Sequence, residues 1–191
     1  MVVAPELFQS AHAHAALECL ESTCMNSNGG KGIATLARGD MAYRPVYDNS
    51  DASEDSTTAG GWNYHQGPEW LWPFGYYLRA RLLFFTRPPT PAWVTKPYCS
   101  PHTPPPPSPS PHGTPHTHAT KSRWLYSRLE KVRLHMEESE EGGLPELTNA
   151  GDSFCKDSCT VQAWSGATVL DALYDLHVLQ RVDNHPPPLV R

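Results

Sequence analysis

The chain contains no hydrophobic run that approaches the roughly eighteen residues needed to cross a membrane. The longest candidate, residues 76–85, is interrupted by Arg79 and Arg81. The N-terminal stretch MVVAPELF has neither a basic segment nor a long apolar segment, so we expect no signal peptide. The sequence therefore argues against a membrane partner.

Clusters of basic residues are also missing. Charged residues make up 18% of the 191 residues and the net charge is −5, whereas a nucleic-acid-binding surface needs gathered lysine and arginine. The cysteines are scattered, and only Cys155 and Cys159 lie close together, which does not give two pairs with zinc-ligand spacing. The segment GGKG at 29–32 is too short for a phosphate-binding loop. The sequence thus predicts no nucleic-acid partner, no metal and no cofactor.

Proline, in contrast, is abundant and unevenly placed. Twelve of the 20 prolines fall between Pro88 and Pro115. A segment of Pro, Ser, Thr and His cannot bury enough apolar surface to form a core, and it favours polyproline II or disorder. This shift in composition predicts four parts along the chain. They are a first helical part at 1–86, a Pro- and His-rich insert at 87–121, a second helical part at 122–180, and a disordered tail at 181–191.

Apolar residues that recur at spacings of three and four predict four helices. The first covers about 4–23, where Pro5 suits a first turn. The second begins near Pro68 and is apolar on almost every side, which predicts burial. The other two cover 122–138 and 160–179. Because no convincing alternating strand is visible, the predicted fold class is all-α.

Aromatic and amide side chains crowd the segment GWNYHQGPEWLW at 61–72. Sugar rings stack their C–H faces on aromatic rings, and sugar hydroxyls bind planar amide and carboxylate groups. An alternative is that the aromatic residues are core residues and that Glu69 is an acid favoured in the first turn of a helix. Composition alone leaves both interpretations open. The candidates for sugar contacts are Asn63, Tyr64, His65, Gln66, Glu69 and Trp70.

Glu146 is the second candidate for chemistry. It follows Gly-Gly-Leu-Pro on a constrained loop, where a carboxylate can act as a general base or a nucleophile, although it could also be an ordinary loop glutamate. Asp48 is a possible third acid, but Asp-Asn also forms simple turns. Gln162 and Trp164 open the last predicted helix and could face the same cavity.

These segments carry a family resemblance. The blocks NYHQGPEWLWPFGYYLRARL and GLPELTNAGDSFCKDSCTVQAWSGATVLDALYDL closely resemble the C-terminal end of the eukaryotic glycogen debranching enzyme family. The blocks MVVAPELF and DMAYRPVYDN resemble the adjoining segments, in the same order. The resemblance implies the last helices of an (α/α)6 toroid, present here in part, within a cytoplasmic parent protein that also carries a 4-α-glucanotransferase site.

The resemblance also implies a reaction. The family's glucosidase hydrolyses α-1,6-linked glucose at the branch stubs of glycogen or limit dextrin, with inversion. Inversion needs an acid and a base about 6.5–9.5 Å apart. By resemblance Glu146 is the base, the residues of the aromatic segment line the sugar site, and Asp48, Gln162 and Trp164 are weaker lining candidates. The acid would lie in an earlier barrel segment, so we expect this chain to need the upstream parts of the parent barrel and to be inactive alone.

The chain departs from the family in two places. Between Phe85 and Trp124 the Pro-rich tract replaces a helix and a short loop, and the chain continues beyond Leu176, where family members stop. Two alternatives to an enzyme therefore stay open. One is a non-catalytic carbohydrate-binding fragment. The other is an interaction protein whose PPPPSPSP stretch is a ligand for SH3 or WW domains, although an inert linker fits that stretch as well.

Overall fold

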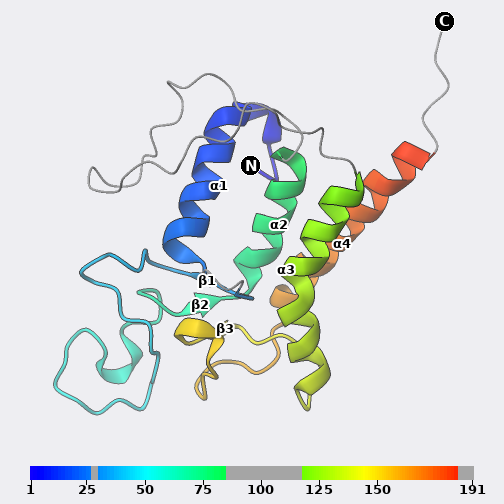
Figure 1. Cartoon of the computed structure of the whole chain (residues 1–191). Helices are drawn as coiled ribbons and strands as arrows, with labels where there is room; N and C mark the ends of the chain where they lie inside the picture. Colours follow the sequence, from blue (N-terminus) through cyan, green and yellow to red (C-terminus); the bar gives the residue numbers. More distant parts are fainter. Residues whose placement is uncertain (27–29, 85–117, 185–191) are drawn as a thin grey trace, which may run out of the picture.

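Two helices that pack on each other, α2 (Trp72–Phe84) and α4 (Ala163–Asn184), form the centre of the fold. The computed structural model describes residues 1–26, 30–84 and 118–184. Helix α1 (Ser10–Cys24) packs on α2, and α3 (His118–Glu138) contributes to the same core. In Figure 1, α1 and α2 stand above a small sheet, α3 runs down past the sheet, and long loops lie below it.

A close backbone contact holds α2 against α4. A Cβ atom placed on Gly75 would lie 2.2 Å from the carbonyl carbon of Thr168, so only glycine permits this approach. The Thr168 hydroxyl donates a hydrogen bond to the carbonyl oxygen of Trp72 at 2.9 Å. One turn further on, Arg79 pairs with Asp175 at 2.7 Å. Helix α4 thereby fixes the start of α2 and the segment that leads into it.

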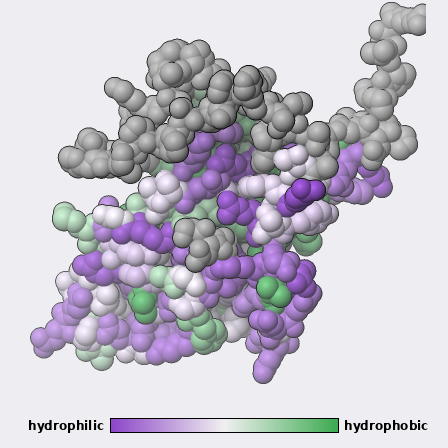
Figure 2. Space-filling model, viewed as in Figure 1, coloured by the Kyte–Doolittle hydropathy of each residue, from purple (hydrophilic) through white to green (hydrophobic). Residues whose placement is uncertain are grey.

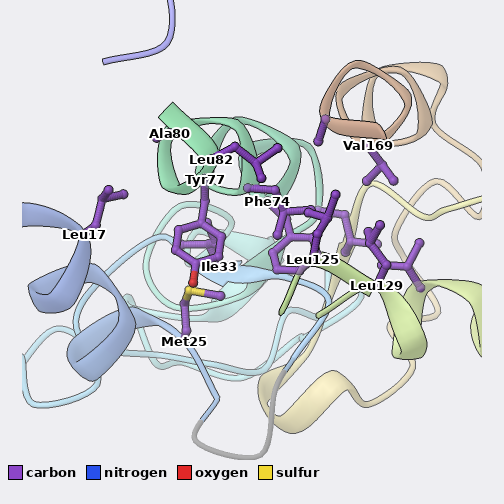
Figure 3. Packing of buried hydrophobic residues seen from close by; sticks show 14 of the residues in the cluster. Leu17, Met25, Ile33, Phe74, Tyr77, Ala80, Leu82, Leu125, Leu129 and Val169 are labelled. Carbon is purple, nitrogen blue, oxygen red and sulfur yellow. The ribbon is translucent and has the colours of Figure 1, made fainter. Parts of the chain in front are cut away.

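The hydrophobic core fills the space between the helices (Figure 3). Phe74 and Leu78 of α2 are completely buried, which confirms the predicted burial of the second helix. Leu125 of α3 is also completely buried, and Ala172 of α4 faces the same cluster. Other members of the cluster are Leu17, Met25, Ile33, Tyr77, Leu82, Leu129, Val132, Val169 and Leu176.

Three very short strands form an antiparallel sheet in the order β1-β2-β3. They are β1 (Ile33–Ala34), β2 (Glu69–Trp70) and β3 (Leu147–Thr148). The prediction of a helix-rich chain is confirmed, but the prediction of an all-α fold missed this sheet. Strands of two residues are too short to show an alternating pattern, so nothing in the sequence marks them as strands.

The start of the second helix also differs from the prediction. The helix expected from Pro68 begins at Trp72, because β2 takes up the residues before it. Pro73 then lies in the first turn, where the missing N–H has no intrahelical partner to lose. The predicted first helix is confirmed as α1, and Pro5 lies in a separate 3-10 turn (Pro5–Leu7) that precedes it.

Two helices extend across the boundaries predicted for the insert and the tail. Helix α3 begins at His118, inside the stretch assigned to the insert at 87–121, and α4 runs to Asn184, past the expected tail boundary at 181. The rest of the insert, including the PPPPSPSP stretch, and the rest of the tail lie outside the described residues.

The described surface is mostly polar on the face shown in Figure 2, where hydrophobic residues form separate spots. Leu170 and Tyr174 of α4 are each 66% exposed. None of the helices within the described ranges is both long enough and apolar enough to cross a membrane.

Candidate active site

Glu146 lies on the loop between α3 and β3, and its backbone is held from two sides. Its N–H donates to the carbonyl oxygen of Cys159 at 3.0 Å, and its carbonyl oxygen accepts from the N–H of Leu71 at 3.1 Å. The first bond ties the loop to the segment that leads into α4, and the second ties it to the segment that leads into α2. The position of the half-buried Glu146 side chain is therefore set by both central helices.

The Glu146 carboxylate has two polar side chains as neighbours. Gln162, the residue just before α4, donates from Nε2 to Oε1 of Glu146 at 3.1 Å. The amide oxygen of Gln162 accepts in turn from the Ser165 hydroxyl at 3.1 Å, which fixes the orientation of the amide. Burial raises the pKa of Tyr64, and a hydrogen bond to Glu146 raises it further. Tyr64 thus stays protonated at neutral pH and acts as a donor beside the carboxylate.

One group of aromatic rings surrounds Tyr64. His65 and Trp70 stack with their ring centres 5.1 Å apart and an angle of 22° between planes. Tyr64 meets Trp70 edge to face at 4.8 Å, and Tyr47 lies 5.0 Å from Tyr64 on another side. The Trp70 indole N–H donates to the Tyr64 carbonyl oxygen at 3.2 Å. His65 and Gln66 are exposed at the edge of this group and can contact a ligand.

A second group of rings lies at the starts of α2 and α4. Trp72 and Trp164 stack with centres 4.2 Å apart and an angle of 8° between planes, and Tyr76 meets Trp72 edge to face at 6.0 Å. Trp164 is 48% exposed, so one face of the pair is open. Because Gln162 precedes Trp164 by two residues, this second group is joined to Glu146 through the start of α4.

Two of the predicted site residues have buried side chains with protein partners. Asn63 is 0% exposed and donates from Nδ2 to the carbonyl oxygens of Arg44 and Val46 at 2.9 and 2.6 Å. Glu69 is also 0% exposed and pairs with Arg38 at 2.8 Å. The expectation that these two face a substrate does not match the structure. The physical reason is that a buried amide and a buried carboxylate need partners, and the two backbone carbonyls and the Arg38 guanidinium supply them.

Asp48 also lies in a different setting from the one expected. Its carboxylate accepts from the N–H and the hydroxyl of Ser50 at 2.9 and 2.6 Å, and it pairs with Lys156 at 3.2 Å. The Ser50 hydrogen bonds, followed by Lys156, lower the pKa of Asp48 to about 2. Asp48 is therefore ionised at neutral pH and has no proton to give to a leaving group.

The sequence did not point to Tyr47 or Ser165 as neighbours of this site. Tyr47 lies in an irregular segment, and Ser165 lies in the first turn of α4 without a motif that marks it. Their contacts with Tyr64 and Gln162 depend on how the loops fold, so a local pattern could not reveal them.

The arrangement suits a polyhydroxylated ligand and an attacking water. Open aromatic faces can stack on sugar rings, and amide and carboxylate groups can bind sugar hydroxyls. A carboxylate accepts protons at up to about four lone-pair positions, so the two neighbours of Glu146 leave room for a water. The described site therefore combines open aromatic faces with one half-buried carboxylate.

Comparisons with known proteins show which family the chain resembles. A family model described as amylo-alpha-1,6-glucosidase matches residues 1–171. The chain is also 40% identical over 176 residues to a glycogen debranching enzyme of Saccharomyces cerevisiae. That alignment covers 92% of this chain but 10% of the yeast protein, so the chain spans about a tenth of its relative's length.

Proposed function

Because this chain belongs to the amylo-alpha-1,6-glucosidase family, we propose that it carries the general-base side of a glucosidase site for α-1,6-linked glucose. The base is Glu146. The observation that supports this role is its position between Gln162 and Tyr64, with aromatic rings on both sides. Glycogen or limit dextrin is the proposed substrate, and the cytoplasm is the proposed location, both carried by the family.

The proposed reaction is hydrolysis with inversion. A base of this kind takes a proton from water as the water attacks the anomeric carbon, and a separate acid protonates the leaving oxygen. Gln162 fixes one oxygen of Glu146, so the carboxylate does not need to reorient when the water arrives. Pre-orientation of this kind lowers the barrier because the entropy cost is met before the reaction step.

The proton donor is the part of the mechanism that Asp48 cannot supply, because its pKa of about 2 keeps it ionised. We propose that the acid belongs to another segment of a longer glucosidase and that the four helices belong to an (α/α)6 toroid completed by that segment. On this proposal the isolated chain binds a sugar without turning it over. The second candidate function, a carbohydrate-binding protein with no catalysis, makes the same prediction for this chain alone.

The sugar wall is proposed to consist of the two ring groups. His65, Gln66 and Trp70 form one side, and Trp164 with Trp72 forms the other. Asn63 and Glu69 then support the wall from behind and make no contact with the sugar.

Binding and turnover are tested on the same samples. Tryptophan fluorescence of the full chain is titrated with isomaltose, and glucose release from limit dextrin is measured in parallel. We expect saturable binding, weakened in Trp70→Ala, and no glucose release. Glu130→Gln, which removes an exposed carboxylate on α3, is the matched control and should bind normally.

Two outcomes would contradict what we propose for this chain. Glucose release that disappears in Glu146→Gln would show that the chain is catalytic alone and that its acid lies within it. Failure of the folded wild-type chain to bind isomaltose or limit dextrin would contradict the proposed site.

A further inference from the structure

Glu69 is a completely buried carboxylate that gathers donors from three separate segments. Arg38 donates to Oε1 at 2.8 Å, and the Asn26 amide lies 3.2 Å from each oxygen. The backbone N–H groups of Gly151 and Asp152 donate to Oε1 and Oε2 at 3.1 and 3.2 Å. A buried charge is retained only when it is paired and hydrogen-bonded, and these contacts meet that need.

The two backbone donors come from an unusual turn that follows β3. Gly151 and Asp152 have φ angles of 76° and 63°, and consecutive N–H groups in such a turn form a concave anion site. A positive φ at a residue other than glycine needs support from its surroundings. Asp152 receives it from both sides, since its carboxylate accepts from the Lys31 N–H at 3.0 Å and from Lys131 Nζ at 3.0 Å.

This turn is connected to the Glu146 carboxylate through the segment just before it. Ala150 donates its N–H to the Pro45 carbonyl oxygen at 3.2 Å, and the Asn149 side chain accepts from the Tyr47 N–H at 2.8 Å. Tyr47 packs on Tyr64, and Tyr64 lies beside the Glu146 carboxylate. The turn thus helps to position Tyr47, against which Tyr64 packs.

A second connection runs through the sheet. Glu69 is paired with Thr148 across β2 and β3, and Trp70 is paired with Leu147. The next N–H along the chain, that of Leu71, binds the Glu146 carbonyl oxygen. The backbone of Glu69 is therefore held in the sheet beside β3, the strand that directly follows Glu146. Its side chain clamps the turn at the other end of β3.

We propose that Glu69 is a positioning residue, which clamps the turn at Gly151 and Asp152 and thereby holds Glu146 against Tyr64. It does not contact the sugar. This inference deepens the proposed function and rests on it for the chemical role of Glu146, but the coupling of Glu69 to the Glu146–Tyr64 pair can be measured without any sugar.

The experiment follows the pair directly. The full chain is labelled with ¹³C at the tyrosine ring carbon that bears the hydroxyl, and the Tyr64 signal is assigned with Tyr64→Phe. Removal of the carboxylate charge in Glu146→Gln should shift the Tyr64 signal at constant pH, and the size of this shift is the Tyr64 response to Glu146. In Glu69→Gln we expect the response to be lost or strongly reduced while the circular dichroism of the helices is unchanged.

A matched variant separates positioning from general stability. Glu21 is also a carboxylate in an arginine and tyrosine network, pairing with Arg81 at 2.6 Å and accepting from Tyr77, but it joins α1 to α2 away from the loops. Glu21→Gln should lower the thermal midpoint and leave the Tyr64 response intact. If Glu69→Gln does not fold, Arg38→Gln, which leaves Glu69 on the turn but removes its ion pair, should give a partial loss of the response.

The outcomes distinguish this inference from the proposed function. A Tyr64 response that persists in folded Glu69→Gln and in Arg38→Gln overturns the positioning role, whatever the wild type binds. If the wild type binds isomaltose, Glu69→Gln should weaken that binding, because Glu69 precedes Trp70 on β2 and loss of the clamp displaces this part of the sugar wall. If the wild type binds no sugar but the response is lost in Glu69→Gln, the clamp holds and only the proposed function fails.

Discussion

The indole rings of Trp72 and Trp164 lie 4.2 Å apart, centre to centre, with an angle of 8° between their planes. The two residues come from the first turns of α2 and α4, the helix pair at the centre of the fold. The stack therefore depends on how the N-terminal ends of α2 and α4 are placed relative to each other, and the candidate site lies at these ends. It also presents an open aromatic face, since Trp164 is 48% exposed.

Replacing Trp164 with alanine should remove both the stack and one wall of the site. Stacked indoles couple their ultraviolet transitions, and Trp164→Ala should remove any exciton signal of this pair from the circular dichroism spectrum. Isomaltose binding should weaken about tenfold, which corresponds to about 1.4 kcal/mol of binding free energy. A loss of this size is typical when an aromatic contact and its buried area are removed. Tyr174→Ala removes another exposed ring of α4 and should leave both measurements unchanged. An exciton signal that survives Trp164→Ala would contradict the stacked geometry.

The helices could be predicted because their signal is local and periodic. The stripe in α3 and the apolar surface of α2 repeat every three to four residues, and burial of that surface against α4 is what the structure shows. The starts of the helices were less certain. Whether Pro68 or Pro73 lies in the first turn depends on β2, and β2 exists only because two distant strands lie beside it.

The site was partly predictable for the same reason. The types of residue in the aromatic segment and the rigid loop around Glu146 are visible in the sequence, and the structure brings Tyr64, Glu146 and Gln162 together. The burial of Glu69 could not be predicted. Its partners lie 31, 43 and 82 positions away along the chain, and no local pattern records contacts of that range.

Gly75 is expected to be essential for the packing of α2 on α4. A Cβ at this position would meet the Thr168 backbone at 2.2 Å, so Gly75→Ala must push the helices apart. We expect a loss of at least about 2 kcal/mol in the free energy of unfolding, as for other overpacked interiors. Gly166→Ala is the matched control, since nothing lies within 4 Å of its added Cβ, and it should stabilise α4 by about 0.5–1 kcal/mol. Equal effects of the two changes in urea denaturation would refute this account.

Asp48 should contribute to a pH dependence of stability at low pH. The Ser50 hydrogen bonds lower its pKa from an ordinary value of 3.8 to about 2 in the folded chain. Folding thus favours the ionised form of Asp48. The contribution of Asp48 to the free energy of unfolding is therefore complete above about pH 4 and disappears as pH falls toward about 2. The difference in unfolding free energy between wild type and Asp48→Asn should shrink over this window. Ser50→Ala should raise the pKa of Asp48 toward its ordinary value, so the loss of stability should be complete at a higher pH than in the wild type. A difference in unfolding free energy between wild type and Asp48→Asn that stays constant down to pH 2 would contradict this role of Asp48.

Gly67 is expected to determine the shape of the aromatic segment. Its φ angle is 147°, and a Cβ there would lie 2.6 Å from the Arg44 carbonyl carbon, so alanine is both strained and obstructed. The adjacent Gln66 carbonyl oxygen accepts from the Arg44 N–H at 2.6 Å. If the alanine side chain separated these two loop segments, His65 and Gln66 would move. Gly60→Ala is the matched control, because Gly60 has a φ of 61° but open space around it, and it should cost only the roughly 1–2 kcal/mol of a left-handed residue. Gly67→Ala should cost more and should also weaken isomaltose binding, whereas Gly60→Ala should leave binding unchanged. Urea denaturation measures the loss of stability, and tryptophan fluorescence measures isomaltose binding. If Gly67→Ala and Gly60→Ala lost equal stability and bound isomaltose equally well, the Arg44 contact would not shape the site.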